Sequence, residues 1–430
     1  MRYRILSISW MVFVFVGFAT EYASAETVRM WTFLNPKSSS PREVALAKII
    51  KGFEEQNPGI NIVVEPQAWD QMSPKFLASS NSDNAPDIVW VVNDYLGDAI
   101  ASGSLADLNE VFINKWPETK KANFRDTFWD ATTVNGKQYG LFVSRNYVAL
   151  LYRKDLFDQA GLKAEDIKTW DELRAAAAKL RQKDATGAVS RYGFSGQYSQ
   201  QQADVGIFVP YMLGAGQVPF HKNGKANFAN EAGVAGANFV LNMIKEGVSP
   251  AQAANWTGDD MLEQFASGRL AMAIVGVVRV PSMQSKLGAE KVGVMLLPSI
   301  DGKAHSPSVV QGWSVGIWSG SHVKEASGKF VDYMMSDPGD SIWIDTGKQI
   351  PGMKSNLEIM RSFLQEPTND FLNVAATGIR DAGWLPPIEF SIGGYRQAIN
   401  NAFQKMIVEN VDPMTALQAA EVEFNTQNGR

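Results

Sequence analysis

The chain has 430 residues, a formal net charge of −5 at pH 7 and no cysteine. The absence of cysteine excludes disulfides, thiolate nucleophiles and cysteine metal sites, and the negative charge argues against nucleic acid or an anionic membrane as a bulk partner. A chain of this length exceeds what one hydrophobic core usually supports, so we expect two lobes.

The first 25 residues are typical of a cleavable export signal. Arg2 and Arg4 precede an apolar stretch over residues 5–18, and residues 23–25 (ASA) fit a small-residue cleavage site. The apolar stretch is short for a membrane span, which needs about 20 residues, so cleavage is favoured over a membrane anchor. A bacterial lipoprotein would need a cysteine at the cleavage site. We therefore expect residues 1–25 to be removed and the protein to be released into the periplasm.

Strands and helices alternate in the next segment. Residues 28–33 (VRMWTF) predict a first strand, and a capping box that begins at Ser40 opens a helix. Residues 60–64 (INIVV) predict a second strand, buried on both faces, and residues 87–92 (DIVWVV) predict a third strand after a helix over 71–79. This alternation is typical of a parallel α/β sheet with right-handed crossovers.

The pattern changes near residue 135, where an Asn-Gly pair favours a hairpin turn. Residues 139–152 then predict a long extended segment, and a second capping box at Thr169 opens a helix. Helices dominate from there until strand character returns at residues 291–297. A last helix begins at Asp412, which is followed by proline at the first helical position.

Residues 259–276 (DDMLEQFASGRLAMAIVG) join an amphipathic helix to an apolar strand. The two leading aspartates favour the helix N-terminus, and Gly268 is a natural left-handed helix end. Residues 270–275 predict a central strand whose alanines let the flanking helices approach closely. We expect this strand to end at Gly276, and the family resemblance given below implies that this end lies beside the ligand cleft.

Catalytic motifs are scarce. Residues 312–316 (GWSVG) match the GxSxG pattern of serine hydrolases, but the apolar run continues past Ser314, so we expect this serine in mid-strand. The three histidines share no metal-ligand spacing, and the sequence has no phosphate-binding or dinucleotide-binding motif. We expect no catalytic residue, metal or cofactor. A glycosidase with two distant carboxylates remains an alternative.

Aromatic residues point to a sugar ligand. Several of the 12 tryptophans fall where a strand ends or a loop begins, beside Asp, Asn, Gln or Arg. Aromatic rings stack on the C–H faces of sugars, while polar side chains bond the hydroxyls. Asn93 and Asp94 directly follow the third strand, at the carboxyl edge where open α/β sheets form a crevice. Core packing is the competing interpretation of each tryptophan.

Four stretches occur together in a recognisable order: FEEQNPGINIVVEP, APDIVWVVNDYLGDAIASGSLADLNE, LYRKDLFDQAGL with the following TWDEL, and FASGRLAMAIVG. Two weaker ones are QGWSVGI and the helix around FVDYMMSDPGDSIW. Together they cover most of residues 28–355. On these stretches the chain resembles the bacterial extracellular solute-binding proteins of family 1 (the maltose-binding type), which are the sugar-binding components of ABC importers.

The resemblance implies an α/β, type II periplasmic-binding-protein fold. Each of its two lobes is a mainly parallel sheet flanked by helices, and the ligand lies in a cleft between the lobes. The N-terminal lobe would hold residues 26–142 and 310–352, and the C-terminal lobe residues 143–309 and 353–430. Crossings are expected near residues 141–147, near 308–313 and near Gly352, where hinges absorb the backbone change on closure.

The resemblance also implies a function and a site. A protein of this family captures a mono- or oligosaccharide, passes it to inner-membrane permease subunits and catalyses nothing. Trp31 matches a tryptophan of the family's first strand, and Asp94 matches an acidic residue that bonds sugar hydroxyls. Where some relatives carry a stacking tryptophan after Gly276, this chain has VVR, which ends at Arg279. The expected ligand-binding residues are Trp31, Asn35, Trp69, Asp70, Asn93, Asp94, Arg145, Tyr198, Trp256, Arg279, Gly312, Trp313, Trp384 and Arg396.

Two alternatives remain open. If two of Arg145, Arg279 and Arg396 converge in the cleft, an anionic solute such as a sugar acid or a phosphorylated polyol fits the same fold, since guanidinium groups bind carboxylate or phosphate bidentately. Surface ion pairing is the competing interpretation of these arginines. The second alternative is a secreted carbohydrate-active enzyme. In every case we expect a monomer with no nucleic-acid partner.

Overall fold

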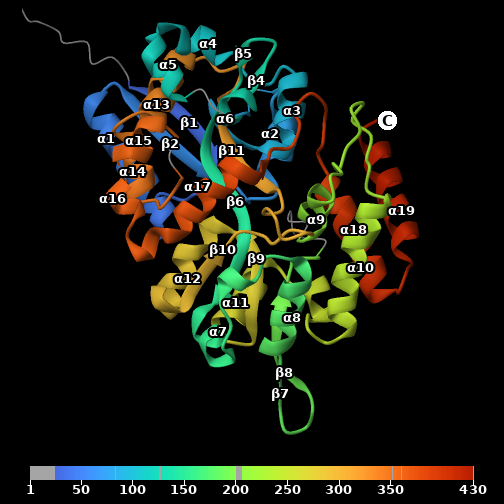
Figure 1. The fold of residues 1–430 in the computed structure, drawn as a ribbon. Coiled ribbons are helices and arrows are strands. Elements are labelled where there is room, and N and C mark those ends of the chain that lie inside the picture. The colour runs from blue at the N-terminus through green and yellow to red at the C-terminus, as the bar shows by residue number, and fades with distance from the viewer. Residues whose placement is uncertain are drawn as a thin grey trace, which may run out of the picture.

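The computed structural model describes residues 25–82, 84–124, 127–199, 206–350, 352–359 and 361–429. The predicted export signal lies outside these ranges, except for its last residue. Figure 1 shows two lobes, one above the other, with the long strand β6 running through both. Within the described ranges, no helix combines the length and the apolar character that a bilayer span requires.

One curled sheet joins the two lobes. Its strand order is β2-β1-β3-β11-β6-β9-β8-β7, with β10 also beside β6 and β12 beside β11. The strands are β1 (Glu26–Thr32), β2 (Ile60–Pro66), β3 (Ile88–Val92), β6 (Leu141–Arg153), β7 (Gln182–Lys183), β8 (Val189–Ser195), β9 (Leu270–Gly276), β10 (Val292–Met295), β11 (Ser308–Ile317) and β12 (Gly383–Trp384). A separate hairpin consists of β4 (Thr133–Val134) and β5 (Lys137–Gln138). This hairpin turns at the predicted Asn-Gly pair.

Helices cover the sheet in both lobes. The N-terminal lobe, built on β1, β2 and β3, has α1 (Pro41–Gln56), α2 (Met72–Ser79), α3 (Asn93–Ala101), α4 (Leu108–Val111), α5 (Glu118–Phe124), α6 (Thr127–Asp130), α13 (Lys324–Met335) and α14 (Gly339–Asp345). The C-terminal lobe, built on β7 to β10, has α7 (Lys154–Ala160), α8 (Trp170–Leu180), α9 (Phe208–Gly214), α10 (Glu231–Lys245), α11 (Gly258–Ala266), α12 (Val280–Leu287), α18 (Tyr395–Val408) and α19 (Pro413–Gln427). Between α14 and α18 the chain forms α15 (Lys354–Ile359), α16 (Arg361–Leu364) and α17 (Asp370–Ala382).

The α/β class is confirmed, but the prediction of a mainly parallel sheet in each lobe needs correction. β1 lies parallel to both β2 and β3, and β8 lies parallel to β9. The remaining pairings of β6 and β11 with β3, β9 and β10 are antiparallel. These two long strands pass from lobe to lobe and lie antiparallel to these neighbours, whereas the short strand β12 lies parallel to β11.

The prediction that the second strand is buried on both faces was also wrong. β2 was expected to be buried on both faces, but only Ile62 in it is buried, and Val63 is exposed. β2 is the edge strand of the sheet, so its one neighbour is β1. An apolar run therefore did not distinguish an edge strand from a central one here.

Local sequence signals set the helix starts as predicted. The backbone N–H of Thr169 donates to the Glu172 carboxylate at 2.8 Å, and the N–H of Glu172 donates to the Thr169 hydroxyl at 3.2 Å. At the last helix, the N–H of Thr415 donates to the Asp412 carboxylate at 3.1 Å. These contacts satisfy helix N–H groups that have no partner within the helix.

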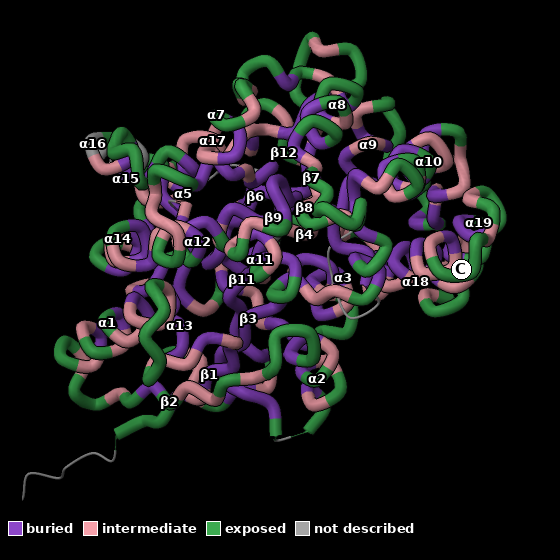
Figure 2. The backbone as a smooth tube through the Cα atoms, turned by 90° about the horizontal axis from the view of Figure 1, so that it is seen from below, coloured by how far each residue is buried: buried purple, intermediate pink, exposed green. Residues whose placement is uncertain are grey.

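Each lobe has its own hydrophobic core. One cluster of buried side chains draws on residues 28–143 and 313–353, and a second draws on residues 148–309 and 392–424. A third cluster lies around β6, β9, α12 and α17. In Figure 2 the buried part of the chain follows the sheet through both lobes. The division is compatible with the expected lobes, although their exact boundaries stay a prediction.

The predicted turn at Gly268 is held by an arginine at the end of β6. Gly268 has φ +77°, a left-handed conformation, just after α11. The Arg153 guanidinium donates to the carbonyl oxygen of Phe265, the last turn of α11, at 3.0 Å. It also forms a two-pronged ion pair with Asp155, at 2.8 and 2.7 Å. The hydrogen bond from Arg153 lowers the pKa of Asp155 below its ordinary value of 3.8.

We expect Asp155→Asn to lower the free energy of unfolding by about 1–3 kcal/mol at pH 7, because charge-assisted hydrogen bonds to Arg153 are lost. The depressed pKa means that this stability is present above pH 3.8 and is lost as the pH falls through the lower, folded-state value. The difference between parent and variant should therefore narrow below about pH 4. Urea unfolding of parent and variant at pH 7 and below about pH 4 measures the difference in stability. A difference that grows at the lower pH would contradict the ion pair between Asp155 and Arg153.

Candidate functional site

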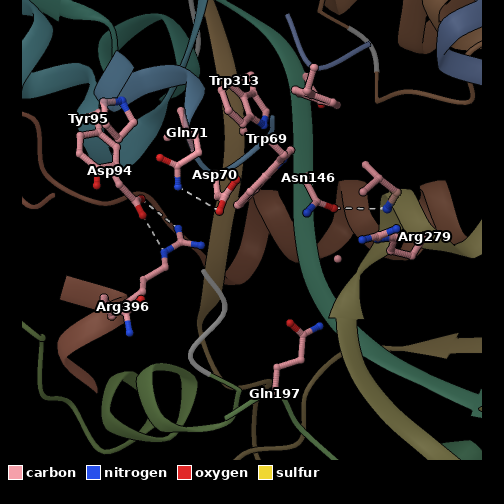
Figure 3. A pocket seen from close by; sticks show the side chains of 18 of the residues that line it. Trp69, Asp70, Gln71, Asp94, Tyr95, Asn146, Gln197, Arg279, Trp313 and Arg396 are labelled. Atoms are coloured by element: carbon pink, nitrogen blue, oxygen red, sulfur yellow. Dashed lines mark hydrogen bonds and ion pairs between the residues drawn. The ribbon is translucent and has the colours of Figure 1, made fainter. Parts of the chain in front are cut away.

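A cavity of about 960 Å³ lies between the two lobes. This is near the upper end of the range for small-molecule sites, roughly 300–1,000 Å³. From the N-terminal lobe it is lined by residues that include Phe33, Arg42, Trp69, Asp70, Asp94 and Trp313. From the other lobe the lining includes Asn146, Gln197, Gly276, Arg279 and Arg396. Figure 3 shows the labelled side chains around this space.

An aromatic wall forms one side of the cavity. Trp69 follows β2 and is 42% exposed, which is unusual for so large an apolar side chain. Its ring meets Trp313 edge to face, with 5.6 Å between the ring centroids, and Trp313 in turn lies 5.0 Å from Phe33. Trp313 is only 4% exposed, so it supports the ring of Trp69 from behind. The exposed ring of Trp69 is suited to stack on a sugar.

Asp94 and Arg396 form a buried ion pair in the cavity wall. Asp94 lies in the first turn of α3, directly after β3, and Arg396 lies near the start of α18. The Arg396 guanidinium contacts the two carboxylate oxygens of Asp94 at 2.8 and 2.9 Å. The side chains are only 5% and 9% exposed. In Figure 3 Arg396 reaches up to Asp94 from below, so this pair connects two segments 302 residues apart in the sequence.

The strand β9 ends beside the cavity, as the sequence predicted. All seven of its residues are buried, and Gly276 lines the cavity. A Cβ atom at Gly276 would collide with the side-chain amide of Asn146 on the neighbouring strand β6. The Asn146 side-chain oxygen accepts a hydrogen bond from the N–H of Val278 at 3.3 Å. The small residue at 276 thus leaves room for a polar side chain that faces the ligand space.

We expect Gly276→Ala to weaken ligand binding by about tenfold, because the added methyl group displaces the Asn146 amide and its hydrogen bonds. Titration calorimetry measures this effect. Gly59→Ala is the matched control, since a Cβ at Gly59 meets no atom within 4 Å. Equal affinities for both variants would show that Asn146 takes no part in binding.

Some predicted residues do line the cavity. These are Trp69, Asp70, Asp94, Arg279, Gly312, Trp313 and Arg396. The structure places the others outside the lining, namely Trp31, Asn35, Asn93, Arg145, Tyr198, Trp256 and Trp384. Trp31 is 3% exposed, and its indole N–H donates to Glu65 at 2.8 Å. Trp256 and Trp384 pack against the hydrophobic core, and Asn93 is buried. The Asn35 side chain accepts a hydrogen bond from the N–H of Lys37 at 3.1 Å.

Three of these residues lie next to residues that do line the cavity, and one of them is Asn93, between Val92 and Asp94. Arg145 points away from it, lies over the ring of Phe128 at 4.1 Å and donates to the carbonyl oxygen of Gly352 at 3.1 Å. Its neighbour Asn146 faces the cavity. Tyr198 is 1% exposed beside Phe403, and burial raises its pKa, whereas its neighbour Gln197 lines the cavity. Successive side chains of a strand point to opposite faces, so in β6 the side chain that lines the cavity is Asn146, one residue after Arg145.

Sequence reasoning also missed Arg42. It lies near the start of α1, half-buried, and its guanidinium is 5.3 Å from the ring centroid of Phe33. The pKa of Arg42 is lowered to about 10, mainly by burial and secondly by the positive charge of Arg279. The available signal was its position just after the first strand, where other cavity residues gather. Arg42 therefore remains charged at neutral pH, and it lines the same cavity as Arg279 of the other lobe.

Neither a metal site nor a serine-hydrolase nucleophile turn is found among the described residues. Across the ranges the structure describes, no group of three or more His, Cys, Asp or Glu could hold a metal ion. Ser314 of the GxSxG match lies inside β11 and is 1% exposed, as predicted. It therefore lacks the strand-to-helix turn that presents a nucleophile.

Comparisons with known proteins agree with this architecture. The family model for bacterial extracellular solute-binding proteins matches residues 37–340. A maltooligosaccharide ABC transporter solute-binding lipoprotein of Streptococcus pneumoniae is 24% identical over 353 residues, which cover 80% of this chain and 76% of that protein.

Solved structures show the same fold. An ABC substrate-binding protein of Listeria monocytogenes, in complex with cycloalternan, superposes with a TM-score of 0.80 at 24% identity, over 94% of this chain and 100% of that one. The GacH receptor of Streptomyces glaucescens, solved unliganded and with acarbose, gives a TM-score of 0.78 at 19% identity, over 94% and 99%. The two-lobed type II arrangement is thereby confirmed.

Proposed function

Because the chain belongs to the family of bacterial extracellular solute-binding proteins, we propose that it captures a mono- or oligosaccharide between its lobes and delivers it to the permease subunits of an ABC importer. The observation that carries this proposal is the interlobe cavity, whose exposed Trp69 is flanked by polar side chains from both lobes. The relatives named above support a carbohydrate ligand, since two of them were solved with oligosaccharide-type ligands.

The chemistry of the lining suits a sugar. Trp69 offers a flat apolar face, while Asp70, Asn146 and Gln197 offer hydrogen-bonding groups around it. Sugars present both kinds of surface, C–H faces and hydroxyls, and so need both kinds of partner. The volume of about 960 Å³ leaves room for more than one sugar ring.

The crossing strands supply a way to signal occupancy. β6 pairs with β11 in its first half and with β9 and β10 in its second half, and the β6–β11 register shifts between Trp313 and Ser314. Such an irregularity bends a strand and is a natural place for a hinge. A ligand that contacts both lobes binds the closed form better, and this difference in affinity is what shifts the population. The permease would then recognise the closed form.

The remaining features of this proposal follow from the sequence. We place the mature protein in the periplasm as a monomer, after cleavage of residues 1–25 and without a lipid anchor. The ligand-contacting residues would be Trp69, Asp70, Asp94, Arg279, Gly312, Trp313 and Arg396, with Asn146 and Gln197 added. The lobes would keep the boundaries given above.

Tryptophan fluorescence with a panel of mono- and oligosaccharides tests this function. We expect a saturable change with at least one saccharide and no product after prolonged incubation. Chromatography of the same samples would reveal any cleavage. Steady release of product from a glycan would instead support a carbohydrate-active enzyme and overturn the proposal.

A further inference from the structure

We propose that Arg42 and Arg279 together bind an anionic group of the ligand, so that the captured saccharide carries a carboxylate or a phosphate. This inference rests on the proposed function, because it concerns the same cavity. Arg42 comes from α1 in the N-terminal lobe, and Arg279 follows β9 in the C-terminal lobe. Both line the cavity.

Among the residues that the structure describes, Arg42 has only the adjacent Glu43 as a nearby negative charge. Within the described part of the chain it makes no ion pair, and its guanidinium lies 5.3 Å from the Phe33 ring centroid. The adjacent Glu43 is occupied elsewhere, because its carboxylate accepts hydrogen bonds from the N–H groups of Asn35 and Ser40, both at 3.2 Å. A half-buried guanidinium in a binding cavity therefore has donors to offer a ligand.

Arg279 already has an ion-pair partner, but this pair is weak. It pairs with Asp259 at 2.9 Å, but the two side chains are 45% and 81% exposed. Exposed ion pairs contribute little, because solvent and salt screen them. A ligand oxyanion, less exposed inside the cavity, can replace Asp259 as the partner of this guanidinium.

The charged side chains of the lining sum to one net positive charge. The cavity is lined by three arginines and two aspartates, although the whole chain carries −5. Arg396 is neutralised by Asp94. Asp70, the other carboxylate, accepts a hydrogen bond from Gln71 at 3.2 Å and forms no ion pair among the described residues. A ligand anion can therefore pair with Arg42 and compete with Asp259 for Arg279.

The two guanidinium groups also repel each other while the site is empty. The charge of Arg279 is the second cause, after burial, of the lowered pKa of Arg42. An oxyanion placed between them removes this repulsion and can accept bidentate hydrogen bonds from each. Because the arginines belong to opposite lobes, the same anion would favour the closed form. The anionic group would then set both specificity and closure.

Titration calorimetry with paired acidic and neutral probes tests this proposal. The pairs are D-galacturonate with D-galactose, digalacturonate with its methyl ester, and glucose 6-phosphate with glucose. We expect at least one acidic probe to bind about tenfold or more tightly than its neutral partner, since charged hydrogen bonds are stronger than neutral ones. The first two pairs report a carboxylate and the third reports a phosphate. The preference should shrink as salt is raised.

Variants assign the preference to the two arginines. Arg42→Gln and Arg279→Gln should each weaken the preferred acidic probe by about tenfold and leave its neutral partner nearly unchanged. Arg380→Gln is the matched control, because Arg380 is a surface arginine, 71% exposed, that pairs with its neighbour Asp381 outside the cavity. Circular dichroism melts, with Arg42→Lys as a milder change, confirm that a loss of binding is not a loss of fold.

Each result has a distinct meaning. If neutral saccharides bind and acidic ones bind no more tightly, the anionic site is wrong while the proposed function stands. If the acidic preference exists but survives both glutamine variants, the two arginines do not form the site. If no saccharide of either kind binds, both the inference and the proposed function fail.

Discussion

Replacing Arg396 with methionine should lower the free energy of unfolding by about 3–5 kcal/mol, the largest stability effect that we expect from any single change. The reason is the Asp94 carboxylate. Its side chain is 9% exposed and both its oxygens contact the Arg396 guanidinium. Without that guanidinium, a buried negative charge is left uncompensated in the cavity wall.

Urea unfolding of the parent, the single variant and the double variant Asp94→Asn/Arg396→Met measures this effect. The double variant removes both charges, so it should recover much of the lost stability, because a buried ion pair contributes little beyond its own desolvation. Such a double-mutant cycle isolates the interaction between the two side chains. A single variant that loses less than about 1 kcal/mol would contradict the buried pair.

Trp69→Ala should weaken saccharide binding by about 2 kcal/mol or more, which is roughly 30-fold. Trp69 is the exposed member of the aromatic wall, and its ring is held by the edge contact with Trp313. The alanine variant removes the apolar face on which a sugar ring would stack. Calorimetric titration with the saccharide that binds the parent gives the change directly.

Trp69→Phe is the control for this change. Phenylalanine keeps an aromatic face of smaller area, so it should retain most of the affinity. If the alanine variant binds as tightly as the parent, the stacking role of Trp69 is wrong. If alanine and phenylalanine lower the affinity equally, the indole group matters for something other than its face.

Local sequence signals predicted the local structure well. The capping boxes at Thr169 and Ser40, the proline after Asp412 and the left-handed Gly268 each depend on residues a few positions apart, and each helix or turn is where it was expected. The strand β9 was predicted from its own residues in the same way. These features need no knowledge of the rest of the chain.

Long-range arrangement was harder to predict. The edge position of β2 and the antiparallel entry of β6 and β11 depend on which strands pair, and that is decided by segments far apart. An apolar run such as that of β2 looks the same at an edge or at the centre of a sheet. The family resemblance gave the two lobes, but not the direction of each strand.

The candidate site shows the same limit. Asp94 and Arg396 were each expected near the ligand, yet their pairing across 302 residues was not expected. Arg145 was expected at the ligand and Asn146 was not named, because the face to which a strand residue points depends on the register of that strand. Arg42 was overlooked because it looked like an ordinary helix residue. The structure alone shows that it lines the same cavity as Arg279.

The most direct test of saccharide capture between the lobes is a crystal structure of the protein saturated with the saccharide that binds it in solution. The account predicts one intact saccharide in the cavity, stacked on Trp69 and in contact with residues of both lobes, Arg279 among them. A saccharide on an outer surface, in contact with one lobe only, or cleaved would contradict it.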